Sequence, residues 1–140
     1  MRKQRKRVGR GVLERLGAML ISGIFVYGGY EAIREPGGRA AKAEKLGLPE
    51  GEAMVRLNGA LMILGGTALA FGKKPKLAAM ALIGTLVPTT LAGHRFWEEG
   101  DPKGRSMQLV QFLKNLGLLG GLLILLSKRR TVSGPAVDEV

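Results

Sequence analysis

The sequence predicts an all-α integral membrane protein, a bundle of four transmembrane helices. Three observations predict this class. The charged residues, 24% of the 140, crowd into the two ends and the connections and leave long runs without a charge. The 22 glycines are about twice the number expected from an average usage of roughly 7%. The basic residues are divided unevenly between alternate connections, as in membrane proteins with a fixed orientation.

Four uncharged runs form the cores of the predicted spans. Each is somewhat shorter than the roughly 20 residues that cross a hydrocarbon core. The shortfall closes when one basic residue near an end is included, because Lys and Arg can extend to the headgroups. Arg15, Arg56 and Lys114 are then part of their helices. The runs are residues 16–30, 57–72, 77–93 and 115–127. A soluble four-helix bundle is the alternative, but these helices have almost no polar face.

The first helix is predicted over residues 11–33, after a basic arm at residues 1–10. It should end before Glu35-Pro36-Gly37-Gly38, because proline followed by two glycines is a strong stop signal. A cleaved signal peptide is the alternative reading of this segment. However, Glu14 and Arg15 interrupt the apolar stretch and no good small-residue site follows it directly. We therefore expect a retained span.

The remaining elements follow from apolar runs and turn signals. Residues 39–46 predict a short amphipathic helix that Gly47 caps, lying along the outer membrane surface or exposed as a solvated loop helix. Pro88 should kink the third helix, with Thr85, Thr89 and Thr90 bonding to the freed backbone groups. The later spans are predicted at residues 51–72, 76–96 and 106–127, and residues 128–140 form a polar tail. In the last span Gly117-x-x-x-Gly121 has the small-residue spacing that allows helices to pack closely.

The distribution of basic residues predicts the orientation. If the N-terminus is cytoplasmic and the chain alternates, twelve Lys and Arg residues lie inside and seven outside. The inner ones are in the stretch MRKQRKRVGR, in the turn at residues 73–76 and in the tail at residues 128–130. This bias predicts a multi-pass protein of the plasma membrane with both termini in the cytoplasm. In a soluble protein a net charge of +11 would suggest nucleic acid, but here the lipid bilayer explains it and we expect no nucleic-acid partner.

Several kinds of chemistry are excluded by composition. The chain has no cysteine and a single histidine, His94, so thiolate chemistry and a His-pair or Cys-type metal site are absent. No carboxylate lies in the middle of a predicted span, so an acid–base relay across the membrane is also absent. We predict no catalytic residues and no metal site.

The polar residues inside the spans all fall in the predicted outer leaflet. Gln108, Gln111 and Asn115 are spaced 3 and 4 apart, so they share one helix face, which should point into the bundle. The same reasoning places Asn58 inward. One interpretation is a pocket that opens outward, lined by Tyr27, Asn58, His94, Gln111 and Asn115. The other is a set of hydrogen bonds between helices.

The sequence also resembles the DoxX family of small bacterial membrane proteins, over residues 15–126. The resemblance rests on Arg15 and on an ordered series of motifs. These are FVYGGY at residues 25–30, KLGLP at 45–49, the Gly65-Gly66 pair, KPKLAA at 74–79, HRF at 94–96 and NLGLLGG at 115–121. The LGLP connection is the most specific of them.

Resemblance to this family implies four transmembrane helices and an association with redox metabolism, since the family is named after a subunit of a thiosulfate:quinone oxidoreductase. Our leading hypothesis is a non-catalytic membrane subunit that anchors or assists an oxidoreductase partner, and the predicted pocket would take a quinone or another amphipathic molecule as its ligand. A homo-oligomeric small-solute or lipid transporter is the alternative. The chain has Asn58 where relatives often have a glutamate, which puts a charge-dependent role at that position in doubt.

Overall fold

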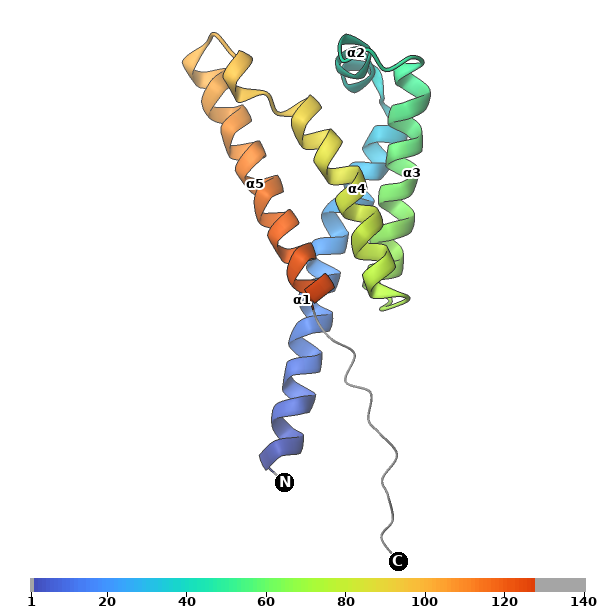
Figure 1. The fold of residues 1–140 in the computed structure, drawn as a ribbon, viewed down its shortest axis with the longest axis vertical. Helices are drawn as coiled ribbons and strands as arrows, with labels where there is room; N and C mark the ends of the chain where they lie inside the picture. The colour runs from blue at the N-terminus through green and yellow to red at the C-terminus, as the bar shows by residue number, and fades with distance from the viewer. Residues whose placement is uncertain (1, 128–140) are drawn as a thin grey trace, which may run out of the picture.

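A computed structural model describes residues 2–127, and residues 2–10 by their backbone alone. The polar tail predicted at residues 128–140 lies outside the described residues. The described chain is helical throughout, apart from short connections (Figure 1). The elements are α1 (Arg2–Arg34), α2 (Gly37–Lys45), α3 (Gly51–Ala70), α4 (Pro75–Gly93), the 3₁₀ helix η1 (Phe96–Glu98) and α5 (Pro102–Ser127).

The predicted fold class is confirmed. Within residues 2–127, four helices are long and apolar enough to cross a membrane. These candidate spans are Gly11–Arg34, Gly51–Ala70, Pro75–Glu98 and Pro102–Ser127. The remaining α-helix, α2, is the short amphipathic element that was expected after the first span, and Ala40 and Ala43 are buried on one side of it. The chain is a multi-pass membrane protein.

Two helices end in the caps that their glycines predict. After α3, Gly72 has a φ of +66°; its amide bonds the Leu69 carbonyl, and the amide of Lys73 bonds that of Ala68. After α2, Gly47 has a φ of +80° and the same pair of bonds closes the helix. This is the Schellman arrangement, in which a left-handed residue just past the helix satisfies its last carbonyls.

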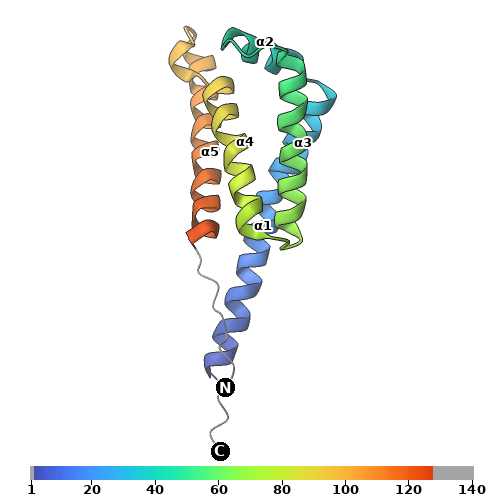
Figure 2. The same ribbon diagram turned by 45° about the vertical axis from the view of Figure 1, so that its right-hand side comes forward.

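Other helix boundaries differ from the prediction. α1 begins at Arg2, nine residues before the predicted start, because Arg, Lys and Gln are good helix formers and no proline intervenes. α1 therefore extends well past the α3–α4 turn (Figures 1 and 2). α5 begins at Pro102 and not at residue 106, because Asp101 caps it: its carboxylate accepts a hydrogen bond of 2.8 Å from the amide of Gly104. α4 ends at Gly93, three residues early.

Glycines bring α1 and α3 into close contact. A Cβ added at Gly29 would lie 2.5 Å from the carbonyl oxygen of Gly59, and one at Gly59 would lie 2.7 Å from that of Gly29. Two helical turns further along α3, a Cβ added at Gly66 would contact the side chain of Val26 and the backbone carbonyl of Ser22. Because these positions lack side chains, the two backbones touch directly, which is how helices gain packing energy in lipid.

The apolar core lies in the half of the molecule away from α2. Its largest fully buried side chains are Phe25, Leu69, Leu82 and Leu122, one from each long helix. α5 joins this core near its C-terminal end, where Gly121 contacts the side chain of Ile21. Toward the α2 end α5 diverges from α1, with α4 between them (Figure 1). Gly117 has no atom within 4 Å of an added Cβ, so within this chain only one glycine of the predicted Gly117-x-x-x-Gly121 pair is used for packing.

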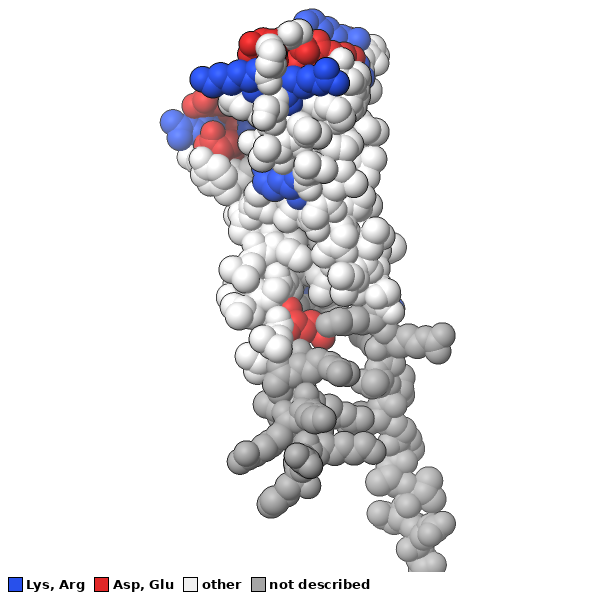
Figure 3. Space-filling view, turned by 90° about the vertical axis from the view of Figure 1, so that its left-hand side faces the viewer, with Lys and Arg blue, Asp and Glu red and all other residues white. Residues whose placement is uncertain are grey.

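The α2 end is fastened by two basic side chains that bind the last carbonyls of helices. Arg56 of α3 donates a hydrogen bond of 2.6 Å to the carbonyl of Ile33 in α1 and also pairs with Glu52. Lys42 of α2 donates one of 2.9 Å to the carbonyl of Gly93 in α4. Cationic groups are favourable at this end of a helix. Figure 3 shows that most of the charged residues on this face gather at this end, above a broad band that is largely uncharged.

Candidate functional site

The polar side chains inside the spans are organised around α4. Two adjacent threonines of this helix bond to amides on its two neighbours. Asn58 of α3 donates to the hydroxyl of Thr89 over 3.1 Å, and Asn115 of α5 donates to that of Thr90 over 3.0 Å. Thr90 and Asn115 are buried. We call these four residues the polar ladder, since they link α3, α4 and α5 at one level.

Each threonine hydroxyl in the ladder is doubly used. Thr89 donates its proton to the carbonyl of Thr85 and Thr90 donates to that of Leu86, both over 2.7 Å. Each hydroxyl thus donates its hydrogen to a backbone carbonyl of α4, and its oxygen accepts a hydrogen bond from the side-chain amide of Asn58 or Asn115. The expected role of the threonines is wrong in one respect. None of these bonds reaches the carbonyl of Gly84, which is the group left without its amide partner by Pro88.

His94 forms a third contact at the end of α4. Its Nδ1 lies 2.9 Å from Oε1 of Gln108 on α5, and both side chains are half-buried. The bond links α4 to α5 one turn nearer the membrane surface than the polar ladder. Beside it, the rings of Phe96, Trp97 and Phe112 pack edge to face, with centroids 5.1 to 6.0 Å apart. This aromatic group is typical of the boundary between lipid and water.

The remaining two predicted pocket residues lie elsewhere. Tyr27 is 67% exposed on α1, and Gln111 is exposed on α5, where it accepts a hydrogen bond from Lys114. The expectation that Gln108, Gln111 and Asn115 all face inward is therefore wrong for Gln111. Of the five predicted residues, Asn58 and Asn115 are joined through the polar ladder, whereas His94 bonds to Gln108, and Tyr27 and Gln111 are exposed.

The polar groups that are buried are satisfied. In the described residues, no buried side-chain nitrogen or oxygen lacks a hydrogen-bond partner. The same part of the chain contains no cluster of three or more His, Cys, Asp or Glu residues suited to a metal ion. The arrangement can hold helices together, and it presents no nucleophile next to a base.

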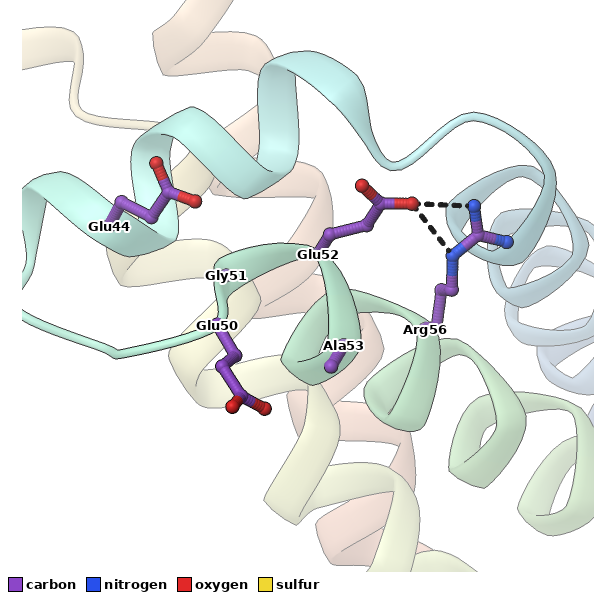
Figure 4. Close-up of a pocket in the computed structure, with 6 residues that line it drawn as sticks. All are labelled: Glu44, Glu50, Gly51, Glu52, Ala53 and Arg56. Carbon is purple, nitrogen blue, oxygen red and sulfur yellow. Dashed lines mark hydrogen bonds and ion pairs between the residues drawn. The ribbon is translucent and has the colours of Figure 1, made fainter.

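Two open pockets lie at the α2 end, and neither contains a predicted site residue. The first, of about 390 Å³, is lined by Glu44, Glu50, Gly51, Glu52, Ala53 and Arg56. Figure 4 shows that its carboxylates point in different directions, with only Glu52 turned toward Arg56. The second, of about 160 Å³, lies between α2 and the end of α4 and is lined by Lys42, Lys45, Leu46, Ala92, Gly93, Arg95, Glu98 and Glu99.

Comparison with known families agrees with the resemblance. The model of the DoxX family matches residues 11–95, which include the first two candidate spans, α2 and the whole of α4. The chain belongs to the DoxX family. The match ends at Arg95, whereas the resemblance had extended to residue 126. Helix α5 of this DoxX protein therefore lies outside the match. No curated protein and no solved structure matches the chain.

Proposed function

We propose that this DoxX protein is a non-catalytic membrane subunit that anchors or assists an oxidoreductase. The observation that carries the proposal is the way the polar groups inside the spans are used. Asn58, Thr89, Thr90 and Asn115 bond to one another or to the backbone, so the polar ladder acts as a fastening between helices. The redox association comes from family membership, because the family takes its name from an oxidoreductase subunit.

Apolar surface supports a role in attachment. Large apolar side chains are exposed along every candidate span, among them Leu20, Leu64, Met80 and Ile124. In a bilayer this surface faces lipid or the helices of a partner. The charged α2 end and the basic turn at Lys73 and Lys74 would then lie at the two membrane surfaces, where a water-soluble enzyme can bind.

The test is the location of a redox activity. Membranes from cells with and without the chain are separated from the soluble fraction, and quinone-linked oxidoreductase activity is measured in both. We expect the activity of the partner to move from the membrane to the soluble fraction when the chain is removed. The purified chain in mild detergent should be colourless and inactive with quinones. Quinone turnover by the purified chain alone would contradict a non-catalytic role.

A ligand pocket for a quinone is the second candidate, and the half-buried His94–Gln108 pair beside Trp97 is the observation that favours it. An imidazole next to aromatic rings at the membrane boundary suits the polar head of an amphipathic molecule. Quinone binding, followed by quenching of Trp97 fluorescence, tests it. The chain has one tryptophan, so the signal reports on this region alone.

A further inference from the structure

We propose that the pocket between α2 and the end of α4 binds the headgroup of a zwitterionic amino-phospholipid. The pocket is lined by cations and carboxylates together: Lys42, Lys45 and Arg95 on one hand, Glu98 and Glu99 on the other. A phosphate that is joined to a primary ammonium group carries the same two charges a few ångströms apart. The pocket therefore complements both ends of such a headgroup.

One basic and one acidic side chain of this pocket remain available to bind a ligand. Lys42 is held by the carbonyl of Gly93, and Arg95 is paired with Glu98 over 2.6 Å. The side chains of Lys45 and Glu99 make no hydrogen bond or ion pair with the described part of the chain. Lys45 is thus free to bind the phosphate, and Glu99 is free to accept a hydrogen bond from the ammonium. Lys42 is bonded to a carbonyl and not to a carboxylate, so its charge adds positive field behind the phosphate.

The pocket lies at the depth where headgroups lie. α4 has 19 residues, a length of about 28 Å at 1.5 Å per residue, which matches a hydrocarbon core of about 30 Å. Its last residue, Gly93, lines the pocket, so the pocket begins where the hydrocarbon ends. Trp97, 49% exposed in the neighbouring turn, is a residue typical of this boundary.

An apolar track for the acyl chains runs down α4 from the pocket. Pro88 and Gly84 lie one and two turns below Ala92, which lines the pocket, and both are exposed. No atom lies within 4 Å of a Cβ added at Gly84, so the helix surface is open there. A lipid whose headgroup occupies the pocket would place a chain on this surface.

The experiment uses the full chain in mild detergent and native mass spectrometry. Dioleoyl phosphatidylethanolamine, phosphatidylglycerol and phosphatidylcholine are added at equal concentration, and the lipid-bound fraction is measured. Phosphatidylethanolamine should bind about two- to fivefold more tightly than the others, the ratio expected for one exposed ion pair. Phosphatidylglycerol has no ammonium for Glu99, and the quaternary ammonium of phosphatidylcholine has no proton to donate.

Two variants separate the two ends of the headgroup. Glu99→Gln should remove the preference for phosphatidylethanolamine over phosphatidylglycerol, and Lys45→Gln should weaken binding of both. The controls are Lys103→Gln and Glu50→Gln, which make the same charge changes on exposed residues outside this pocket. Because all four side chains are exposed, the variants should melt at the temperature of the parent chain, which thermal unfolding checks.

The proposal is overturned if the parent chain binds phosphatidylethanolamine and phosphatidylglycerol equally, or if the control variants reduce binding as much as Lys45→Gln. A last arm separates a lipid from a free phosphate compound. Glycerophosphoethanolamine carries the headgroup without acyl chains, and at the same concentration it should leave the bound lipid in place. Displacement of the lipid by this soluble compound would overturn the assignment of a lipid as the ligand.

Discussion

Asn115 is the buried amide of α5, with 6% of its surface exposed, and its side chain donates a hydrogen bond to the hydroxyl of Thr90. Replacing Asn115 by Leu removes this bond while keeping the branched shape and the number of heavy atoms of the side chain. We expect a loss of about 0.6 kcal/mol in the free energy of unfolding, with ~1–2 kcal/mol as the upper range for hydrogen bonds between membrane helices. The measurement is the unfolding free energy in mixed detergent micelles.

Gln111→Leu is the matched control for Asn115→Leu. It makes the same change one turn away on an exposed side chain whose partner, Lys114, is on the same helix. Stability should stay within a few tenths of a kcal/mol of the parent, as for surface substitutions in general. Equal stability of Asn115→Leu and the parent chain would show that the bond to Thr90 contributes nothing in the membrane.

His94 separates a fastening role from a ligand role. His94→Gln keeps a hydrogen-bonding side chain of comparable reach opposite Gln108 but loses the imidazole. If the residue only links α4 to α5, folding, abundance and the membrane-bound activity of the partner should all remain near those of the parent. Intact folding with loss of quinone binding would instead favour the pocket. In a protein that still folds, a normal phenotype of Tyr27→Phe combined with Asn58→Leu and His94→Gln would end the pocket hypothesis.

At this scale the sequence predicted which residues matter better than what they contact. Asn58 and Asn115 face inward as expected, because an amide in lipid needs a partner. Their acceptors, Thr89 and Thr90, were expected to bond to the backbone groups freed by Pro88. A hydroxyl can donate to a backbone carbonyl and accept from an amide at the same time, so the sequence did not show the second bond. At 3.6 residues per turn, Gln108 and Gln111 are separated by an arc of about 60° around α5. The face of α5 that points into the bundle is narrower than this arc, so Gln108 lies on it and Gln111 lies outside it.

Among the elements, the contact between α1 and α3 depends most on glycine. Gly29→Ala would bring a methyl group to 2.5 Å from a carbonyl oxygen of Gly59, a backbone atom that cannot turn aside. We expect a loss of about 1–3 kcal/mol, the usual cost of overpacking. Gly117→Ala is the control, since nothing lies within 4 Å of its added Cβ. The melting temperature in mild detergent should fall for the first variant and hold or rise slightly for the second.

The helix ends show where local signals suffice. The helix ends at Gly47 and Gly72 could be predicted, because a glycine that can adopt the left-handed conformation, followed by proline within a few positions, stops a helix. The start of α5 was missed although Asp101-Pro102 has the residue types of an N-cap and first helical position. The prediction instead placed the start of this span four residues later, at residue 106. Arg56 and Lys42 could not be assigned to the carbonyls of Ile33 and Gly93, since those contacts join residues far apart in the sequence.

For the whole molecule, uncharged runs and glycine content were enough to predict four spans, because the bilayer imposes the length of each helix. The arrangement of the spans was less accessible. A helix that is apolar on all sides has no polar face to show which side meets lipid and which meets a neighbour. The close α1–α3 contact and the divergence of α5 therefore had to come from the structure. The glycines marked closely packed faces, but Gly66 and Gly117 look alike in sequence and only the first is packed.

Orientation in the membrane is a prediction for the whole chain. The structure places the start of α1 and the turn between α3 and α4 toward one end, and α2 with η1 at the other (Figure 1). The twelve basic residues predicted as cytoplasmic include that turn and the arm before Gly11, against seven on the opposite side. The positive-inside rule counts Lys and Arg near the ends of spans, so it favours a cytoplasmic N-terminus.

A reporter enzyme that is active only outside the cytoplasm checks this orientation. Inserted at Gly100, between η1 and α5, it should be active; fused at Val140, which lies beyond the described residues, it should be silent. A second reporter that works only in the cytoplasm should give the opposite pattern at both sites and serves as the control for expression. If the first reporter were active at Val140 and silent at Gly100, the α2 end would face the cytoplasm. The polar ladder and the proposed lipid pocket would then belong to the inner leaflet.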